Sequence, residues 1–275
     1  MSKLRVRLIS GFIGAALVLL IIFSNSLVFH LAIAAACIIA LYELHKTFGL
    51  QKKWQIVFLD YLFAAFFLFT ASPSFRGQKE LVMFLLATYL MFLLICSVLF
   101  HKNISFSDVG QSLFVLVYGV LLPMHLIYIR GMSDGLALVF LVFIGAWMPD
   151  TFAYFSGCLF GKHKLIPSVS PNKTVEGSIG AIVGAVVMFF LYGFILSYFF
   201  DYSVNYLLLL FLSLLCGVVS QFGDLAASVI KRETGKKDFG NLIPGHGGIV
   251  DRIDSLIFIA PLTYYFLLMF EVICK

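Results

Sequence analysis

Charged residues are scarce in this chain, and their scarcity excludes a soluble fold. Only 12% of its 275 residues are Asp, Glu, Lys or Arg, whereas 61% are hydrophobic. Ordinary soluble domains carry about 25% charged residues. A soluble fold of this length cannot bury so much apolar surface, so the composition indicates an integral membrane protein.

Paired cysteines of the kind that bind metals are also missing. The five cysteines include no CxxC pair, and most lie within apolar runs (Cys37, Cys96, Cys158, Cys216 and Cys274). We expect them to be small buried hydrophobic residues, not disulfides or metal ligands. No small-x-small cleavage site follows the basic segment 3–7, so the first apolar run is expected to be a retained helix.

Long apolar runs fill most of the chain. A transmembrane helix needs about 20 mostly apolar residues. Nine stretches meet this requirement: 7–24, 27–45, 54–72, 81–100, 108–129, 135–157, 177–200, 204–226 and 254–273. We therefore predict an all-α, polytopic transmembrane bundle of about nine spans, with a kink at Pro123 in the fifth.

The basic residues are distributed unevenly across this layout. With a cytoplasmic N-terminus, only four of the 19 basic residues fall on the outer side, namely Arg76, Lys79, Arg130 and Lys275. The other fifteen fall on the cytoplasmic side, as the positive-inside rule requires. Two cytoplasmic loops, 156–176 and 228–254, stand out because the remaining connections are short and plain. We expect function to reside in these loops and in the helix ends that carry them.

The second loop combines glycine with charge of both signs. Five glycines fall within fourteen residues (Gly235, Gly240, Gly245, Gly247 and Gly248). Glycine lets the backbone approach a ligand closely, and nearby Lys and Arg suit phosphate oxygens. Carboxylates among these cations indicate a hard metal such as Mg²⁺. The loop therefore predicts a metal-nucleotide or polyphosphate site; the alternative is a solvated loop that balances its own charges.

Asp224 argues for a functional loop. It lies at the end of an apolar span, where a carboxylate is costly unless it is paired or functional. Asp224, Ser228 and Lys231 are spaced to share one helix face. Asp251 and Asp254 are one turn apart, so they also share a face if the last helix begins just before them.

A longer set of residues extends through both loops. The second loop contains Phe222-Gly223-Asp224, Ser228-Val-Ile-Lys231-Arg232, Lys237-Asp238 and Leu242-Ile-Pro244-Gly-His246-Gly-Gly248-Ile-Val-Asp251-Arg252-Ile-Asp254. The first contains Trp147, Asp150, Ala153-Tyr154-Phe155, Gly157, Phe160-Gly161, Pro167, Ser170-Pro171, Lys173-Thr174 and Glu176-Gly177. Together they resemble the signature of the phosphatidate cytidylyltransferase (CDP-diacylglycerol synthase) family. Residues 1–140 resemble that family only in forming hydrophobic helices.

The resemblance implies an enzyme of phospholipid biosynthesis. In the reaction that the resemblance implies, the phosphate of phosphatidate attacks the α-phosphorus of CTP, and the products are CDP-diacylglycerol and pyrophosphate. It implies Mg²⁺, with a second cation left open, a homodimer, and no nucleic-acid partner. The short N-terminus favours a bacterial inner-membrane enzyme whose active site faces the cytoplasm. We accordingly divide the chain into N-terminal transmembrane helices, residues 1–140, and a catalytic transmembrane domain, residues 141–275.

Each candidate residue receives a role in this interpretation. The catalytic residues are predicted to be Asp224, Asp251, Lys231 and Arg232. The metal ligands are predicted to be Asp224, Asp251 and Asp254. The substrate-binding residues are predicted to be Ser170, Lys173, Ser228, Lys237, His246 and Arg252.

Several roles keep alternatives. Lys173 suits a substrate phosphate, a lipid headgroup or plain solvation. His246 suits a general base or, as we favour, a hydrogen-bonding brace. Asp150 suits a brace or a metal ligand equally. Glu43 is expected to be structural, and Asp60 and His125 are expected to be polar groups in the bundle interior.

Two other classes of protein are less well supported. A transporter would place polar residues near the bilayer midplane, whereas here they gather at the cytoplasmic face. A CDP-alcohol phosphotransferase requires a D-G-x-x-A-R block. The segment Asp134-Gly135-Leu136-Ala137 begins like that block but lacks the continuation.

Overall fold

The chain forms two compact units in the computed structural model, which describes residues 3–72 and 79–275. The first unit joins Met1–Tyr128 to Lys236–Arg252, and the second joins Ile129–Gly235 to Ile253–Lys275. The glycine-rich segment thus belongs to the unit built by the N-terminal helices. Arg76, one of the basic residues assigned to the outer side, lies outside the described residues. The side chains of residues 3–9 and of residue 79 also lie outside them. The functional division at residue 140 stays a prediction.

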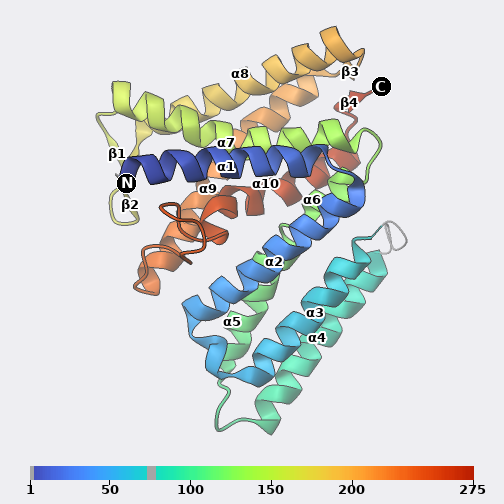
Figure 1. The fold of residues 1–275 in the computed structure, drawn as a ribbon, viewed down its shortest axis with the longest axis vertical. Helices are drawn as coiled ribbons and strands as arrows, with labels where there is room; N and C mark the ends of the chain where they lie inside the picture. Colours follow the sequence, from blue (N-terminus) through green and yellow to red (C-terminus); the bar gives the residue numbers. More distant parts are fainter. Residues whose placement is uncertain (1–2, 73–78) are drawn as a thin grey trace. The chain divides into compact units, whose positions relative to one another are not determined.

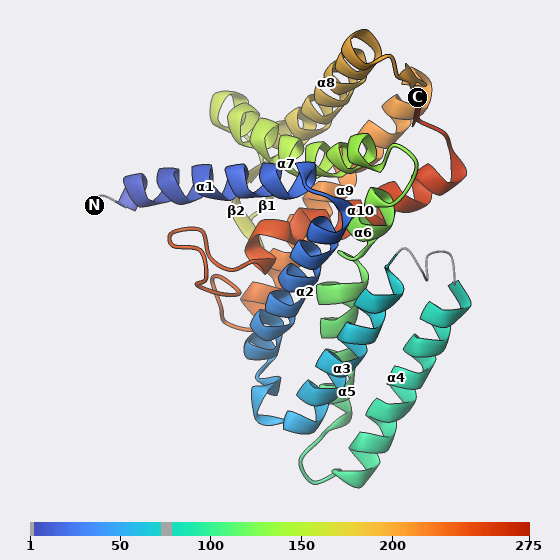
Figure 2. The same cartoon turned by 45° about the vertical axis from the view of Figure 1, so that its right-hand side comes forward.

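The first unit is built of helices. Asn25 caps the second helix by accepting a hydrogen bond from the Val28 N–H, and Gly49 ends it with a φ of 74°. In Figures 1 and 2, α2, α3, α4 and α5 run side by side. The elements are α1 (Lys3–Phe23), α2 (Ser26–Phe48), η1 (Leu50–Lys52), α3 (Trp54–Thr70), α4 (Lys79–Leu99), α5 (Phe106–Leu116), the π-helical turn η3 (Val117–Leu121) and α6 (His125–Arg130).

The second unit packs long helices through small residues. A Cβ at Gly145 would lie 3.0 Å from the Cys216 sulfur, and one at Gly217 would lie 2.9 Å from the Ile182 Cα. Such residues let transmembrane helices approach closely. Its elements are α7 (Gly135–Phe160), the antiparallel hairpin β1–β2 (Lys164–Ile166, Ser170–Thr174), α8 (Val175–Phe200), α9 (Tyr206–Glu233), α10 (Val250–Met269) and the antiparallel pair β3–β4 (Ser203–Val204, Ile273–Cys274). The first turn of α10 begins in the first unit.

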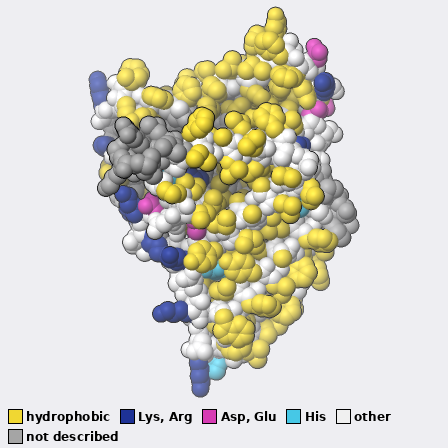
Figure 3. Space-filling model, viewed as in Figure 1, with side chains coloured by type: hydrophobic (Ala, Val, Ile, Leu, Met, Phe, Trp, Pro, Cys, Tyr) yellow, Lys and Arg dark blue, Asp and Glu magenta, His cyan; other side chains and the backbone are white. Residues whose placement is uncertain are grey.

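The helices confirm a polytopic helical membrane protein. Within residues 3–72 and 79–275, each predicted apolar stretch is mostly helical, although the fifth is interrupted and the last runs past the end of α10 into β4. In the part of the chain that the structure describes, seven helical segments are long and apolar enough to cross a membrane, and the shorter apolar helices Ser10–Phe23 and Trp54–Thr70 match the first and third stretches. Hydrophobic side chains cover most of the face in Figure 3. The count of nine spans and the orientation of the N-terminus stay predictions.

Local departures from the predicted outline have physical causes. The fifth stretch is interrupted before Pro123, as predicted. The predicted loops were too long at their starts, because α7 continues to Phe160 and α9 to Glu233. Lys231 and Arg232 lie in the last turn of α9, where positive charge interacts favourably with the helix dipole. The hairpin β1–β2 inside the first loop was not predicted.

The predicted burial of individual polar residues and cysteines is confirmed at most positions. Asp60 and His125 are buried, as expected. Cys37, Cys96 and Cys216 are buried too, and all five cysteines are free. The expectation of burial was wrong for Cys158, which is exposed because it lines a cavity near the end of α7, and Cys274 is only half-buried.

Candidate functional site

A cavity of about 550 Å³ lies in the second unit, lined by residues of α7, the β1–β2 hairpin, α8 and α9. Lys173 on β2 and Asp224 on α9 meet at its wall, with 2.5 Å between the Lys173 Nζ and the Asp224 Oδ2. Gln221, one turn before Asp224, donates to the carbonyls of Gly217 and Ser178 and so ties α9 to α8. The structure therefore brings together two predicted site residues from the two separate sequence blocks.

Two more carboxylates and a second lysine surround this pair. Asp254 on α10 lies near enough to Asp224, Asp150 and Lys231 to interact with each electrostatically. The Ser255 hydroxyl donates to the Asp150 Oδ2 at 3.3 Å, which links α10 to α7. We call Asp150, Asp224 and Asp254, with Lys173 and Lys231, the Asp224 cluster. Like charges this close favour a bound cation or a proton.

The other predicted residues of the second unit lie on α9 and on the β1–β2 hairpin. Ser228 is half-buried on α9, one turn beyond Asp224. Arg232 is exposed, and its Nε–H donates to the Val169 carbonyl at 3.5 Å, which links α9 to the hairpin. Ser170 is half-buried where β2 begins and is not among the residues that line the cavity. Substrate contact by these three side chains stays a prediction.

A second cavity, of about 610 Å³, lies in the first unit along the glycine-rich segment 235–249. Lys237, His246 and Arg252 line it, as does Asp238. Three predicted substrate-binding residues thus share one cavity. The ammonium group of Lys237 and the guanidinium group of Arg252 suit an anion with several oxygens.

Asp251 is buried beneath this loop. Its Oδ2 accepts hydrogen bonds from the Phe239 N–H at 2.8 Å and the Gly248 N–H at 3.0 Å. Gly247 has a φ of +86°, and a Cβ there would lie 2.8 Å from the same oxygen. Asp251 therefore braces the loop backbone, a role that the sequence did not suggest, while its predicted metal role stays untested.

His246 has a partner on the first helix. Its Nδ1 lies 2.8 Å from the Ser10 hydroxyl, which donates to the Pro244 carbonyl at 3.0 Å. This contact supports the brace that we favoured over a general base.

Lys236 begins the loop and was not among the predicted site residues. Its Nζ donates to the Lys46 carbonyl at 2.6 Å, near the end of α2. Partial burial lowers the pKa of Lys236, and the neighbouring Lys46 charge lowers it further. The start of the loop is therefore fastened to an N-terminal helix.

The donor atoms of the Asp224 cluster suit a hard cation. Carboxylate oxygens are the usual protein ligands of Mg²⁺, and the Lys173 ammonium here compensates the charge of Asp224. Among residues 3–72 and 79–275, no three His, Cys, Asp or Glu side chains are spaced to ligate one ion in this structure. Asp224 and Asp251 belong to different units, so an ion shared between them stays a prediction.

The sequence is similar to proteins of known family along nearly its whole length. The profile of the cytidylyltransferase family matches residues 5–270. A phosphatidate cytidylyltransferase of Bacillus subtilis is 33% identical over 277 residues, which cover 98% of this chain and 100% of that protein. Proteins of the same name from Staphylococcus saprophyticus and Staphylococcus haemolyticus are 38% identical over 170 residues, 62% of this chain and 63% of theirs. The similarity includes the N-terminal helices, where we had seen no motif.

Proposed function

The chain belongs to the cytidylyltransferase family and is a nucleotidyltransferase, and we propose that its substrates are CTP and phosphatidate. The products are then CDP-diacylglycerol and pyrophosphate. The observation that carries this proposal is the Lys173–Asp224 pair, at the wall of a cavity formed by helices of membrane-spanning length. Charged groups placed there suit a reaction between a membrane lipid and a water-soluble nucleotide.

The end of α7 beside the cavity supports a lipid substrate. Tyr154 lines the cavity and is 68% exposed, and its neighbours Phe155, Leu159 and Phe160 are exposed too. An exposed apolar surface next to a charged cavity is suited to acyl chains whose phosphate lies within reach of Lys173. Phosphatidate combines those two features in one molecule.

The reaction needs little covalent assistance from the protein. An oxygen of the phosphatidate phosphate attacks the α-phosphorus of CTP, and the bond to the β-phosphate oxygen breaks with its electron pair leaving on pyrophosphate. The attacking phosphate is already an anion near neutral pH, so no strong general base is required. The protein's work is therefore positioning and charge neutralisation.

Each predicted catalytic or substrate-binding side chain, other than the carboxylates, has a proposed role in positioning the substrates or neutralising their charge. Lys173 and Lys231 neutralise phosphate oxygens in the second unit, and Arg232 and Ser228 assist at the same helix end. Lys237 and Arg252 hold the triphosphate at the glycine-rich loop, where Arg offers a bidentate fork. Ser170 and His246 keep their predicted substrate contacts.

Magnesium completes the proposed site. Asp224, Asp251 and Asp254 are its proposed ligands, with Asp150 as the reserve candidate and a second cation left open. Held by these carboxylates, Mg²⁺ would supply the positive charge that two anionic substrates and a pyrophosphate leaving group require.

We place the enzyme in a bacterial inner membrane as a homodimer, with both loops in the cytoplasm, where CTP is available. The uneven distribution of basic residues supports this orientation. A reporter active only outside the cytoplasm should work at residues 201–205 and stay silent at residues 236–248. The opposite pattern would refute the nine-span layout.

The decisive test of activity follows the nucleotide into lipid. Purified protein is given cytidine-labelled CTP with and without phosphatidate, and with and without a chelator. We expect label in the chloroform phase, with equimolar pyrophosphate, only when phosphatidate and Mg²⁺ are both present. If pyrophosphate is released but the cytidine label stays in the aqueous phase, the enzyme transfers the cytidylyl group to an acceptor other than phosphatidate.

A further inference from the structure

Glu43 on α2 makes contacts that the mechanism above does not use. It is only 3% exposed. Its two carboxylate oxygens accept hydrogen bonds from the Ile249 and Val250 N–H groups, each at 3.0 Å. Val250 begins α10, and the first amides of a helix have no partner within that helix. The helix dipole adds a favourable interaction with negative charge. Glu43 therefore caps α10 from a distant part of the sequence.

Two glycines of the loop make room for this carboxylate. A Cβ at Gly240 or at Gly248 would collide with the Glu43 carboxyl group. Neither glycine has a positive φ, so backbone conformation does not require glycine at either position. The sequence suggested that the loop glycines let the backbone approach a ligand, but these two let it approach Glu43.

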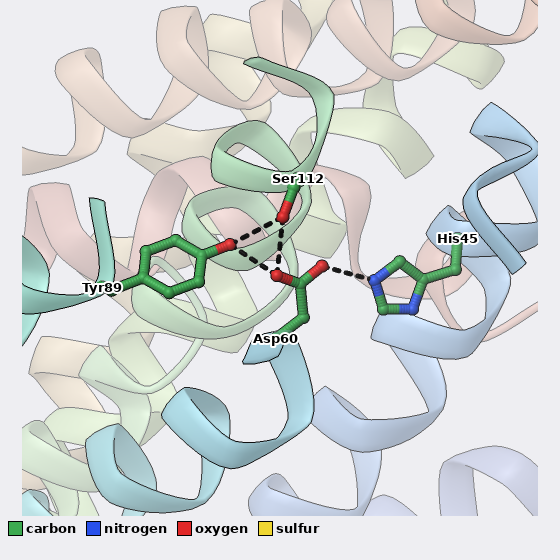
Figure 4. Close-up of polar contacts among 4 residues, drawn as sticks. All are labelled: His45, Asp60, Tyr89 and Ser112. Atoms are coloured by element: carbon green, nitrogen blue, oxygen red, sulfur yellow. Dashed lines mark hydrogen bonds and ion pairs between the residues drawn. The ribbon is translucent and has the colours of Figure 1, made fainter. Parts of the chain in front are cut away.

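The helix that carries Glu43 is held on its other side by a buried polar cluster (Figure 4). His45 Nε2 lies 2.6 Å from the Asp60 Oδ2. The hydroxyls of Tyr89 and Ser112 donate to the Asp60 Oδ1 at 2.5 and 2.6 Å. These four residues, which we call the Asp60 cluster, come from α2, α3, α4 and α5 and are at most 1% exposed. They fix α2 against its three neighbours.

Glu43 and His45 project from opposite sides of α2. Residues two apart on an α-helix are separated by about 200° around its axis. One side of α2 is therefore held by Asp60, while the other holds the glycine-rich loop and the start of α10. Rotation or sliding of α2 would break both sets of contacts together.

We propose that Glu43 is a positioning residue, which keeps the glycine-rich loop in the conformation that binds the triphosphate of the nucleotide. It touches no reacting atom and acts through the loop backbone that presents Lys237, His246 and Arg252. The identity of the nucleotide rests on the proposed function. Loss of Glu43 should accordingly weaken nucleotide binding and leave lipid binding unchanged.

Hydrogen exchange on the purified full-length protein, without substrates, tests the structural half of the proposal. In Glu43→Gln the side chain keeps its size, but its NH₂ group cannot accept a hydrogen bond. One of the Ile249 and Val250 amides then loses its acceptor. We expect exchange across residues 236–252 to accelerate by roughly tenfold or more, while exchange in α4 stays unchanged.

Kinetics on the same variant test the functional half. The KM for CTP should rise by roughly tenfold, with a smaller change in kcat and no change in the KM for phosphatidate. A general loss of folding would lower the active fraction without this selectivity. Equal changes in both KM values would contradict a role confined to the nucleotide loop.

A double-mutant cycle isolates the contact itself. Gly248→Ala should raise the KM for CTP because its methyl group displaces Glu43. In a Glu43→Ala background the space is free, so the same substitution should add no more than about twofold. Gly110→Ala is the matched control, since Gly110 also has no positive φ and faces open space. Effects of Gly248→Ala and Glu43→Ala that multiply independently would overturn the proposal.

The two proposals fail in distinguishable ways. An inactive wild type would overturn the proposed function while the exchange measurements remain readable. If the wild type is active but hydrogen exchange across residues 236–252 is unchanged in Glu43→Gln, only the positioning role is overturned. If Glu43→Ala cannot be purified, Gly240→Ala and Gly248→Ala replace it. Each should accelerate hydrogen exchange across residues 236–252 and raise the KM for CTP, as Glu43→Gln does. Hydrogen exchange at the wild-type rate in both glycine variants would contradict the positioning role of Glu43.

Discussion

The two units each contain an acidic cluster, but the carboxylates in them are compensated differently. Asp60 in the first unit is 0% exposed and receives one imidazole and two hydroxyl groups. Asp224 in the second is 28% exposed, faces the Lys173 ammonium, and lies near the Asp254 carboxylate, which in turn lies near Asp150. One cluster is closed and complete, and the other lines a cavity.

The comparison shows which feature marks a functional carboxylate in this protein. Depth of burial alone would select Asp60. A buried carboxylate whose oxygens are all hydrogen-bonded is stabilised where it is and has little left to offer a ligand. Carboxylates that repel one another are available to a cation, which makes the Asp224 cluster the stronger candidate for chemistry.

Neutralising Asp224 should produce the largest effect and separates the two clusters most sharply. Asp224→Asn keeps the shape of the side chain but removes its charge. We expect turnover to fall by roughly a hundredfold to a thousandfold, while the protein inserts and purifies normally and its Tm is unchanged. Part of the activity should return at raised Mg²⁺ or Mn²⁺, as measured by transfer of label from CTP to lipid.

Asp251→Asn should be nearly as damaging, because Asp251 is both a proposed metal ligand and a brace of the loop. Asp254→Asn should do less if Asp254 acts through water. Normal turnover with normal Mg²⁺ dependence in either Asp224→Asn or Asp251→Asn would exclude the shared metal site. Asp150 would then be the next candidate ligand.

Removing single cations should have the next largest effect. A hydrogen bond to a charged group contributes about 1.5–3 kcal/mol, so Lys231→Ala, Arg232→Ala and Lys237→Ala should each lower kcat/KM by roughly tenfold to a hundredfold. Arg252→Lys should also be harmful, since Lys lacks the bidentate fork. Wild-type kcat/KM in all four variants would mean that these cations are only solvated surface.

The Asp60 cluster should respond in stability instead of turnover. Asp60→Asn replaces the charged acceptor with an amide, and we expect the free energy of unfolding to fall by about 1.5–3 kcal/mol. The KM for CTP should rise only a few-fold, through the loosened α2. Denaturation monitored in detergent, alongside steady-state kinetics, gives both numbers. If Asp60→Asn lost as much turnover as Asp224→Asn, the two clusters would not differ in function as proposed.

Removing one donor from Asp60 should produce the smallest effect. Tyr89→Phe leaves Ser112 and His45 in place and should cost about 0.5–1.5 kcal/mol of stability, with kcat unchanged. Tyr198→Phe is a suitable comparison, because Tyr198 is 70% exposed. Equal Tm shifts for the two variants would show that the buried hydroxyl contributes nothing specific.

The sequence predicted the helices well because their signal is local. Each apolar stretch must satisfy its own backbone hydrogen bonds in the membrane, which requires helix whatever its neighbours are. The interruption near Pro123 was likewise predictable from a residue that cannot donate a backbone hydrogen bond. The β1–β2 hairpin carries no alternating apolar pattern, so nothing local predicted it.

The site was only partly predictable because much of it depends on distant contacts. The sequence blocks indicated Lys173 and Asp224, and the structure pairs them. Glu43 could not be linked to the loop, since its partner Ile249 lies 206 residues away. Gly240 and Gly248 were correctly selected as unusual, but only packing shows that they accommodate a carboxylate.

The discontinuity of the first unit has a consequence for biosynthesis. Residues 236–252 leave the ribosome only after α7, α8 and α9 of the second unit have been made. Until then Glu43 lacks the two amides that compensate its charge, in an environment where an uncompensated carboxylate is costly. The glycine-rich loop is therefore the last part of its own unit to assemble, and a chain whose synthesis stops before α10 begins leaves that unit unfinished.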